Sequence, residues 1–286
     1  MITRFAPSPT GPLHLGHAYS ALLAQDMATA MGGEFLVRIE DIDRTRVRPQ
    51  WDAQIFAYLH WLGLSWPQPV MRQSQRLARY SEKLDWLWAG HHVFACTCSR
   101  RDVIDALGAP QEGADLPTGP DGVIYPGTCR SHQAMAANEH APKDAALRLL
   151  MTSAVAQTHF SFHETGHGPN GETGLIEFTA EDAISDIGDI VLARRDMGTS
   201  YHLSVVLDDA AQDVTHVVRG EDLFDVTKIH VILQRLMGLP TPIYHHHRLI
   251  RDSAGKRLAK RDDARAIAKY RTEGASPDDV RRIVGL

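Results

Sequence analysis

The sequence predicts an α/β fold built around a parallel β-sheet, and three observations support this. A strand at Ile2–Ala6, a tight turn, a helix at Ala18–Gly32 and a second strand at Glu34–Glu40 follow one another as a β-α-β unit. Strand-like apolar segments with a short helix among them return at Ala183–Val218. With 286 residues, 43% of them hydrophobic and 23% charged, the chain can bury a sizeable core.

The remaining elements follow from apolar periodicity and from turn-forming residues. Helical spacing predicts further helices, in chain order, at Gln50–Leu62, Arg76–Gly90, Val226–Met237, Asp262–Tyr270 and Pro277–Val284. Gly, Pro and Asp are dense between Gly108 and Gly127, which predicts a loop-rich insertion there. No internal repeat or low-complexity tract occurs.

Composition narrows the classes of function. The N-terminus lacks a basic stretch followed by an apolar core, and no run of 18 apolar residues occurs, so we expect a cytoplasmic protein without a membrane span. The formal net charge of −5 argues against a uniformly basic nucleic-acid-binding surface. One local basic patch exists at Arg248–Arg271, with nine Lys and Arg against three Asp. By itself such a patch is typical of a solvated helical face.

The segment RFAPSPTGPLHLGH, Arg4–His17, lies where the first strand passes into the first helix. The N-terminus of a helix binds anions through its exposed N–H groups and its dipole. Glycines such as Gly16 allow close approach of a nucleotide, and the three prolines stiffen the turn. His14 and His17 can donate hydrogen bonds to phosphate oxygens. The alternative is a turn that only connects strand and helix.

A second segment, GKRLAKRDD, offers cations that suit a triphosphate. Together the two segments resemble the class I aminoacyl-tRNA synthetases of the glutamyl branch: the first is similar to their HIGH signature, and RLAKR stands at their KMSKS-type loop. RIEDIDRTR, RRDMGTSYHLSVVLDD and VTHVVRGEDL also resemble segments of that branch, in the same order. Two departures are Arg257 for the first Lys and Ala259 for the usual Ser. We expect them to weaken one hydrogen bond to the triphosphate, while Lys260 retains the charge.

The resemblance implies a Rossmann-like doubly wound parallel sheet with a zinc-bearing insertion and a short helical C-terminal extension. The implied division is residues 1–95 and 183–240 for the two halves of the catalytic domain, 96–182 for the insertion, and 241–286 for the lysine loop and C-terminal helices. The substrate would be ATP with Mg²⁺, bound by His14, Gly16, His17 and Lys260. Among these, His14, His17 and Lys260 would be catalytic.

A glutamate pocket must hold one ammonium and two carboxylates, so it needs a buried acid and more than one cation or strong donor. The resemblance implies Glu40 for the substrate ammonium, completed by Tyr201 and Arg219. It also implies a lining strand end made of Arg4, Phe5, Ala6, Pro7 and Ser8. Which arginine binds which carboxylate stays open. For Glu40, Asp41 and Asp43 the alternatives are a solvated strand end or a divalent-metal site.

The three cysteines lie in one part of the chain, as Cys96, Cys98 and Cys129. Their odd number argues against a disulfide framework in the cytoplasm, and a structural zinc site needs a fourth ligand. Tyr125 lies four residues before Cys129, and the glutamyl-queuosine tRNA(Asp) synthetases, which this chain resembles, use three Cys and one Tyr for one structural Zn²⁺. Buried thiols without metal are the alternative, and the other fourth ligands considered are His91, His92 and His132. A second metal site at the three histidines of YHHHR, residues 244–248, is a further alternative.

Only 25 residues follow Arg261, so we expect no anticodon-reading domain. Among the glutamyl branch this matches the glutamyl-queuosine tRNA(Asp) synthetases. The resemblance then implies that L-glutamate is activated by ATP and transferred to the queuosine base at the wobble position of tRNA(Asp), by a monomer. The alternatives are a truncated glutamyl-tRNA synthetase that charges the 3′ end of tRNA(Glu), a non-catalytic tRNA-binding paralogue, and another nucleotidyltransferase with an H-x-G-H motif.

Overall fold

The computed structural model describes residues 1–108, 116–132, 140–156, 158–251 and 266–286. Its helices are α1 (Leu15–Ala30), α2 (Pro49–Trp61), α3 (Leu77–Ala89), α4 (Arg100–Ala106), α5 (Met151–Ala154), α6 (Ala180–Asp182), α7 (Tyr201–Ala211), α8 (Val226–Leu236), α9 (Ile267–Thr272) and α10 (Pro277–Val284). Its strands are β1 (Ile2–Phe5), β2 (Glu34–Ile39), β3 (Met71–Arg72), β4 (Val93–Cys96), β5 (Thr118–Gly119), β6 (Gly122–Val123), β7 (Ala146–Leu149), β8 (His159–Glu164), β9 (Gly174–Thr179), β10 (Val191–Ala193), β11 (His216–Gly220) and β12 (Ile243–His247). No helix within these ranges is both long and apolar enough to cross a membrane.

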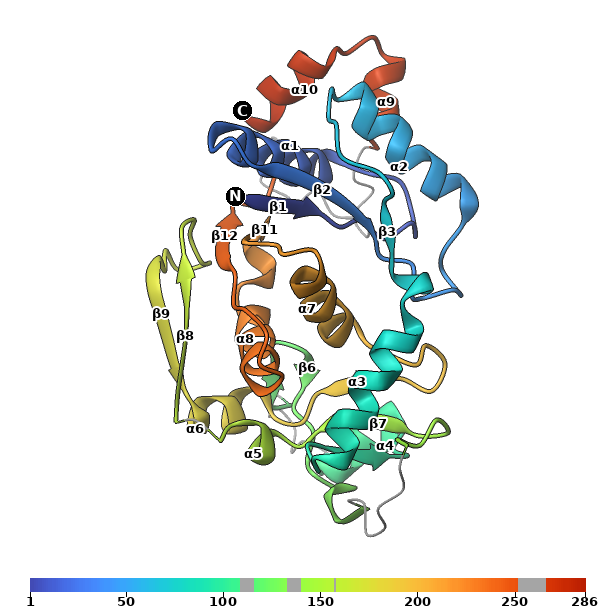
Figure 1. Ribbon diagram of the computed structural model, residues 1–286, viewed down its shortest axis with the longest axis vertical. Coiled ribbons are helices and arrows are strands. Elements are labelled where there is room, and N and C mark those ends of the chain that lie inside the picture. Colours follow the sequence, from blue (N-terminus) through green and yellow to red (C-terminus); the bar gives the residue numbers. More distant parts are fainter. Residues whose placement is uncertain (109–115, 133–139, 157, 252–265) are drawn as a thin grey trace.

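A row of parallel strands forms the central sheet of the molecule (Figure 1). β2 pairs in parallel with β1 and β3, and β12 pairs in parallel with β11 and β8. β1 and β11 begin side by side, since the Thr215 N–H donates to the Ile2 carbonyl at 3.0 Å. β9 pairs with β8 in antiparallel, so the strand order is β3-β2-β1-β11-β12-β8-β9. Its first five strands have the Rossmann-like doubly wound arrangement.

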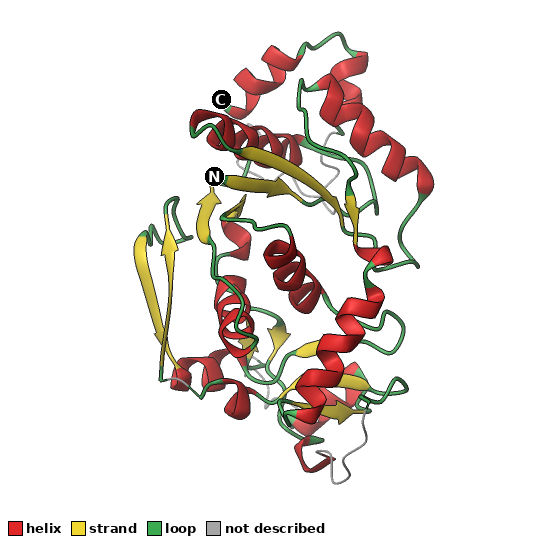
Figure 2. Ribbon diagram, viewed as in Figure 1, coloured by secondary structure: helices red, strands yellow, loops and turns green. Residues whose placement is uncertain are grey.

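Alternate residues of β1 face helices on opposite sides of the sheet. The Thr3 hydroxyl donates to the Ala24 carbonyl in α1, whereas the guanidinium of Arg4 binds Asp209 in α7. Figure 2 shows α1 on one side of β1 and β2 and α7 on the other. Because side chains alternate along a strand, this two-sided cover places Arg4 inside the molecule.

Helix α1 begins at Leu15, three residues earlier than its apolar periodicity indicates. The extra turn forms because His14 is the N-cap and takes part in a capping box with His17. Imidazole is not among the usual capping side chains, so the apolar pattern alone did not indicate this start. The two histidines thereby belong to the first turn of the helix.

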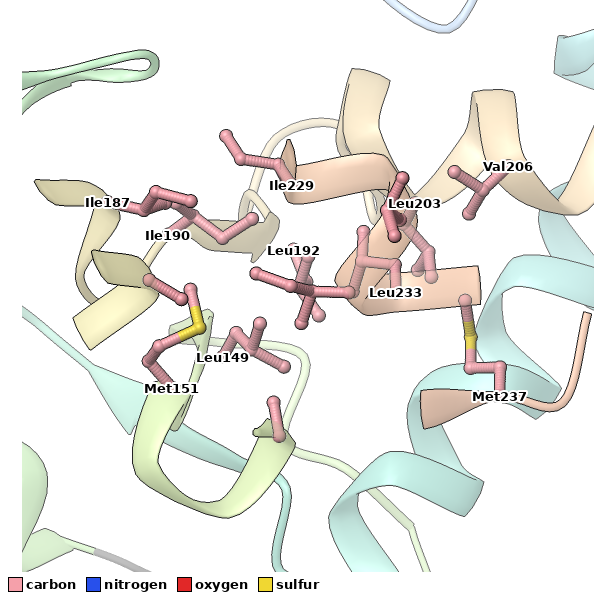
Figure 3. Close-up of a cluster of buried hydrophobic side chains, with 14 of the residues drawn as sticks. Leu149, Met151, Ile187, Ile190, Leu192, Leu203, Val206, Ile229, Leu233 and Met237 are labelled. Carbon is pink, nitrogen blue, oxygen red and sulfur yellow. The ribbon is translucent and has the colours of Figure 1, made fainter. Parts of the chain in front are cut away.

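The apolar side chains form two large cores. Side chains from β7, α5, β10, α7 and α8 point toward one another in the first (Figure 3). The second core surrounds α1, and it includes Ile267, Val280 and Val284 from the C-terminal helices. Arg281 of α10 also forms a two-point ion pair with Asp26 of α1, at 2.7 and 2.9 Å. The last two helices are therefore packed onto the N-terminal part of the fold.

The segment predicted to hold strands and a short helix forms β10, α7 and β11, and α7 has 11 residues. The loop-rich region around residues 108–127 contains the β5–β6 hairpin. Of the helix predicted at Asp262–Tyr270, the described part begins at Ile267 and continues to Thr272. The division into four sequence regions stays a prediction.

Candidate active site and metal centre

A cavity of about 260 Å³ opens at the carboxyl ends of β1 and β11, the two strands at which the strand order reverses. Most of the predicted site residues line it: Arg4, Phe5, Ala6, His14, Gly16, His17, Glu40, Tyr201 and Arg219. Of the described residues predicted to bind glutamate or ATP, two do not line it. The Pro7 carbonyl accepts the backbone N–H of Glu40 at 3.0 Å, and Ser8 lines the neighbouring cavity.

The protons on His14 and His17 are fixed by the start of α1. The backbone N–H of Gly16 donates to Nδ1 of His14, and the backbone N–H of His14 donates to Nδ1 of His17, both at 3.1 Å. A nitrogen that accepts carries no proton, so each neutral ring has its N–H at Nε2. The ring centroids lie 3.8 Å apart, and both residues line the cavity. Both imidazoles therefore offer a donor suited to phosphate oxygens.

The described residues on both sides of the GKRLAKRDD segment lie near the His14–His17 segment. Ile250, near its N-terminal side, lines the cavity, and Ala266, on its C-terminal side, forms a β-bridge with His14. The Ile267 N–H also donates to the Leu13 carbonyl at 2.9 Å. The predicted ATP-binding and catalytic Lys260 itself lies outside the described residues, as do Arg257 and Ala259.

Arg4 is held by a buried carboxylate. Its Nε lies 2.9 Å from Oδ1 of Asp209 and its Nη2 lies 3.4 Å from Oδ2. Arg38, which is fully buried, donates from Nη1 to the same Asp209 at 2.8 Å. Burial opposes ionisation of Asp209, but the two guanidinium groups outweigh it and lower its pKa. Asp209 thus fixes Arg4 while leaving its other N–H groups for a ligand.

Glu40 is the acid that reaches the cavity from the end of β2. Burial raises its pKa to about 7, against the opposing effect of Arg38 and Arg4. Its Oε1 lies 3.5 Å from Nη2 of Arg38. Asp41 instead accepts hydrogen bonds from Ser74, and Asp43 accepts from Thr45. Of the three acids, Glu40 alone lines the smaller cavity, where an ammonium would stabilise its ionised form.

Tyr201 and Arg219 close the other side. Tyr201 is the first residue of α7, whose N-cap is Ser200, and burial raises the pKa of its phenol, so it remains a hydrogen-bond donor. Arg219 of β11 is buried and donates to His246, His230, Thr227 and the Leu223 carbonyl.

Sequence reasoning did not name several residues that line this cavity, among them the polar side chains of Ser20, Asp222 and His247. Nε2 of His247 lies 2.7 Å from the Ser20 hydroxyl, and burial lowers the pKa of His247 to about 4. Alternation along β12 turns its neighbour His246 toward the buried Glu164 instead. The third histidine of this segment, His245, contacts the Thr165 hydroxyl at 3.0 Å. The three histidines of YHHHR therefore have three different partners and do not gather around one point.

A larger cavity of about 620 Å³ adjoins the first and shares Glu40 and Tyr201 with it. Its far wall comes from the insertion and includes Cys98, Asp121 and Arg148. The two cavities therefore meet at the residues predicted to bind the amino acid. The arrangement suits a small substrate in one cavity and a larger acceptor in the other.

The three cysteines converge, with sulfur atoms all within 4.8 Å of one another. The Tyr125 hydroxyl lies 3.5 Å from Sγ of Cys96 and 3.6 Å from Sγ of Cys98, and Sγ atoms of Cys98 and Cys129 are 3.4 Å apart. Zinc bonds of about 2.3 Å to sulfur and about 2.0 Å to oxygen, at tetrahedral angles, separate ligand atoms by about 3.5 to 3.8 Å. The two distances from the Tyr125 hydroxyl and the Cys98–Cys129 sulfur distance thus lie close to those of a tetrahedral metal site.

The electrostatic surroundings of this cluster favour the thiolate form of Cys129. Burial opposes ionisation of Cys129, but hydrogen bonds from Tyr125 and from the backbone of Thr97 lower its pKa to about 6. Burial raises the pKa of Cys98 to about 11. The guanidinium of Arg148 donates to Sγ of Cys96 at 3.3 Å and lies 4.0 Å from the centre of the Tyr125 ring. Of the alternative fourth ligands, His92 instead contacts the Ser153 hydroxyl at 2.8 Å.

Comparison with known proteins gives a consistent family. The family model described as "tRNA synthetases class I (E and Q), catalytic domain" matches residues 1–286. A curated protein of Rhodobacter capsulatus named "Glutamyl-Q tRNA(Asp) synthetase" is 62% identical over 286 residues, which is 100% of both chains. A protein of the same name from Nocardia farcinica is 40% identical over 97% of this chain and 81% of its own.

A solved structure of a glutamate tRNA ligase from Elizabethkingia meningosepticum, in complex with its amino acid, superposes with a TM-score of 0.73 at 24% identity. The superposition covers 96% of this chain and 58% of that chain. This likeness shows the fold.

Proposed function

The chain belongs to the class I tRNA synthetases of the glutamate and glutamine type, and on that premise we propose that it activates L-glutamate with ATP and transfers the glutamyl group to the queuosine base of tRNA(Asp). The observation that carries the proposal is a single cavity. It is lined by an acid for an ammonium, by two buried arginines for carboxylates, and by the histidine-capped N-terminus of α1 for phosphates.

In the first step, the α-carboxylate of glutamate attacks the α-phosphate of ATP in line and pyrophosphate leaves. The protein's contribution is to position the reactants and to stabilise charge. Glu40 holds the substrate ammonium, and Arg4, Arg219 and Tyr201 bind its carboxylates. The Nε2–H groups of His14 and His17 donate to phosphate oxygens, Gly16 allows the nucleotide close to the backbone, and Lys260 adds positive charge. Mg²⁺ accompanies the nucleotide as part of the substrate.

In the second step, a hydroxyl of the queuosine cyclopentenediol attacks the carbonyl carbon of glutamyl-adenylate and AMP leaves. The larger cavity is where we place this acceptor, because it shares Glu40 and Tyr201 with the smaller one. The names of the curated relatives support tRNA(Asp) as the RNA. The basic stretch from Arg248 onward would add salt-dependent contacts to the RNA backbone.

We further propose that Cys96, Cys98, Tyr125 and Cys129 hold one structural Zn²⁺. The close contacts among these four side chains and the low pKa of Cys129 support it. Bound zinc would fix β4 and the loop after β6 against each other and so shape the wall of the larger cavity. We propose a cytoplasmic monomer.

The deciding experiment is incubation of the protein with labelled glutamate, ATP and tRNA(Asp) that carries or lacks queuosine, followed by nuclease digestion to locate the label. We expect label on the anticodon fragment, and none with the queuosine-free RNA. Label at the 3′ terminus of tRNA(Glu) would instead identify a truncated glutamyl-tRNA synthetase. A protein that shows no glutamate-dependent exchange of pyrophosphate into ATP would be a non-catalytic tRNA-binding paralogue.

A further inference from the structure

Arg219 differs from the other buried arginines near the cavity in the kind of group that contacts its guanidinium. Arg4 and Arg38 both contact the carboxylate of Asp209 directly. Among the described residues, no carboxylate lies within 4.0 Å of the Arg219 guanidinium. Its acceptors are uncharged: two imidazoles, the Thr227 hydroxyl and the Leu223 carbonyl. A buried cation of this kind retains its attraction for a ligand carboxylate.

The hydrogen-bond directions around Arg219 follow from chemistry. A guanidinium can only donate, so the imidazole nitrogen that faces it must carry no proton. Nε of Arg219 lies 3.1 Å from Nε2 of His246, and Nδ1 of His246 lies 2.5 Å from Oε2 of Glu164. The proton of His246 is therefore on Nδ1 and is donated to Glu164.

Glu164 is held rigidly in the acceptor role. It ends β8 and is 1% exposed, and its Oε1 accepts the backbone N–H groups of Gly166 and His246 at 2.7 and 2.8 Å. Burial opposes ionisation of Glu164, but these bonds and His246 lower its pKa, so it is an anion at neutral pH. Burial lowers the pKa of His246, which keeps its ring neutral.

We propose that Glu164 and His246 are positioning residues for the glutamate site: Glu164 fixes His246 as the Nδ1–H tautomer, whose bare Nε2 orients Arg219 toward the cavity. Neither residue lines the cavity itself. The neutral ring separates the Glu164 anion from the guanidinium, so Arg219 is aligned without being neutralised. A carboxylate in direct contact with Arg219 would compete with the carboxylate of the substrate. The link to glutamate rests on the proposed function.

The informative variant is Glu164→Gln, which keeps the shape of the side chain. Its carbonyl can still accept the two backbone N–H groups, but its amide then presents N–H to Nδ1 of His246. His246 would have to move its proton to Nε2, facing the Nε–H of Arg219. We expect the KM for glutamate in pyrophosphate exchange to rise about ten- to a hundredfold, as for loss of a hydrogen bond to a charged group, with the KM for ATP little changed.

Glu172→Gln is the matched control. Glu172 lies in the connection between β8 and β9 and binds Asn170, so it takes no part in the Glu164–His246–Arg219 chain of hydrogen bonds. It should leave both KM values unchanged. A second pair tests the acceptor at position 246. His246→Gln offers a carbonyl to Arg219 and should retain more glutamate affinity than His246→Leu, which offers none. Equal glutamate KM values in Glu164→Gln and wild type, or equal losses for glutamate and ATP, would overturn the proposal.

The tautomer can be read without activity. In protein labelled with ¹⁵N-histidine, the protonated and bare ring nitrogens have well-separated shifts, and the His246 signals are assigned by their loss in His246→Gln. We expect Nδ1–H in the wild type, and Nε2–H there would overturn the proposal even if Glu164→Gln does not fold. Nδ1–H in a wild-type protein that activates no glutamate would refute the proposed function. It would still support the hydrogen bonds proposed between Glu164, His246 and Arg219.

Discussion

At the scale of single residues, function depends on how neighbours set the protonation of each group. Glu40, His14 and His17 show this in different ways. Burial brings the pKa of Glu40 to about 7, while the backbone of α1 fixes which nitrogen of each histidine carries the proton. A sequence motif names these residues, but their chemical state comes from what surrounds them.

The pKa of Glu40 predicts a pH dependence of glutamate binding. The substrate ammonium needs the ionised carboxylate, and at pH 6 only about one Glu40 in ten is ionised when the pKa is about 7. The KM for glutamate should therefore fall as pH rises from 6 to 8, by about tenfold, while the KM for ATP changes less. Pyrophosphate exchange measured across this range checks it.

Glu40→Gln supplies the control. It should raise the KM for glutamate about ten- to a hundredfold and abolish the dependence on pH near 7. An unchanged pH profile in this variant would show that another group is titrating.

Lys260 is predicted from the motif to bind the triphosphate. We expect Lys260→Ala to slow adenylate formation by about a hundredfold, which corresponds to about 2.7 kcal/mol of lost transition-state stabilisation, without lowering the melting temperature. Single-turnover formation of glutamyl-adenylate measures the rate. Ala259→Ser is the companion variant and should not slow the reaction, since it adds a hydroxyl donor. A Lys260→Ala variant as fast as wild type would remove this residue from the site.

At the scale of elements, helix termini determine where the site and the C-terminus are anchored. Helix α1 begins with a capping box made of two imidazoles, and the positive end of the helix dipole faces the cavity. Helix α10 begins with an ordinary capping box, in which Ser276 and Asp279 accept each other's backbone N–H groups. The same device therefore lines the cavity at the start of α1, whereas at the start of α10 it only caps the helix.

Ser276→Ala should destabilise the protein by about 1 kcal/mol, because one backbone N–H of α10 loses its acceptor. Urea unfolding monitored by circular dichroism gives the free energy. The exposed Ser65, whose hydroxyl bonds to no other described residue, provides the control Ser65→Ala. Equal stability of the two variants would contradict a capping role for Ser276.

At the scale of the whole molecule, we expect the two cavities to serve different steps of the proposed reaction. The smaller cavity is built by the parallel sheet and α1, and the larger one extends to the cysteine-bearing insertion. Activation of the amino acid should therefore depend on the parallel sheet and α1 and not on the insertion. Transfer to RNA should need both.

Cys98→Ser tests this division. The variant should lose zinc and lower the melting temperature, because metal binding and local folding are coupled. It should retain pyrophosphate exchange within about twofold while transfer to tRNA falls about tenfold or more, in the range found for lost metal-site contacts. Metal analysis by mass spectrometry and the two activity assays give the comparison. Full zinc occupancy in Cys98→Ser would contradict the ligand set.

The sequence alone determined the β-α-β start, most of the helices, the HLGH and lysine segments, and the group of cysteines. These features are local, since periodicity, turn residues and short motifs report on neighbouring positions. The early start of α1 was not indicated, because imidazoles replaced the usual capping residues.

Only the tertiary structure decided which distant side chains meet. The sheet order brings the ends of β1 and β11 together, so Arg4, Glu40 and Arg219 share one cavity. Alternation along β12 sends His246 to Glu164 and His247 to Ser20, although the two histidines are adjacent in sequence. Contacts of this kind depend on strand order and register between segments far apart in the chain, and no short-range pattern encodes them.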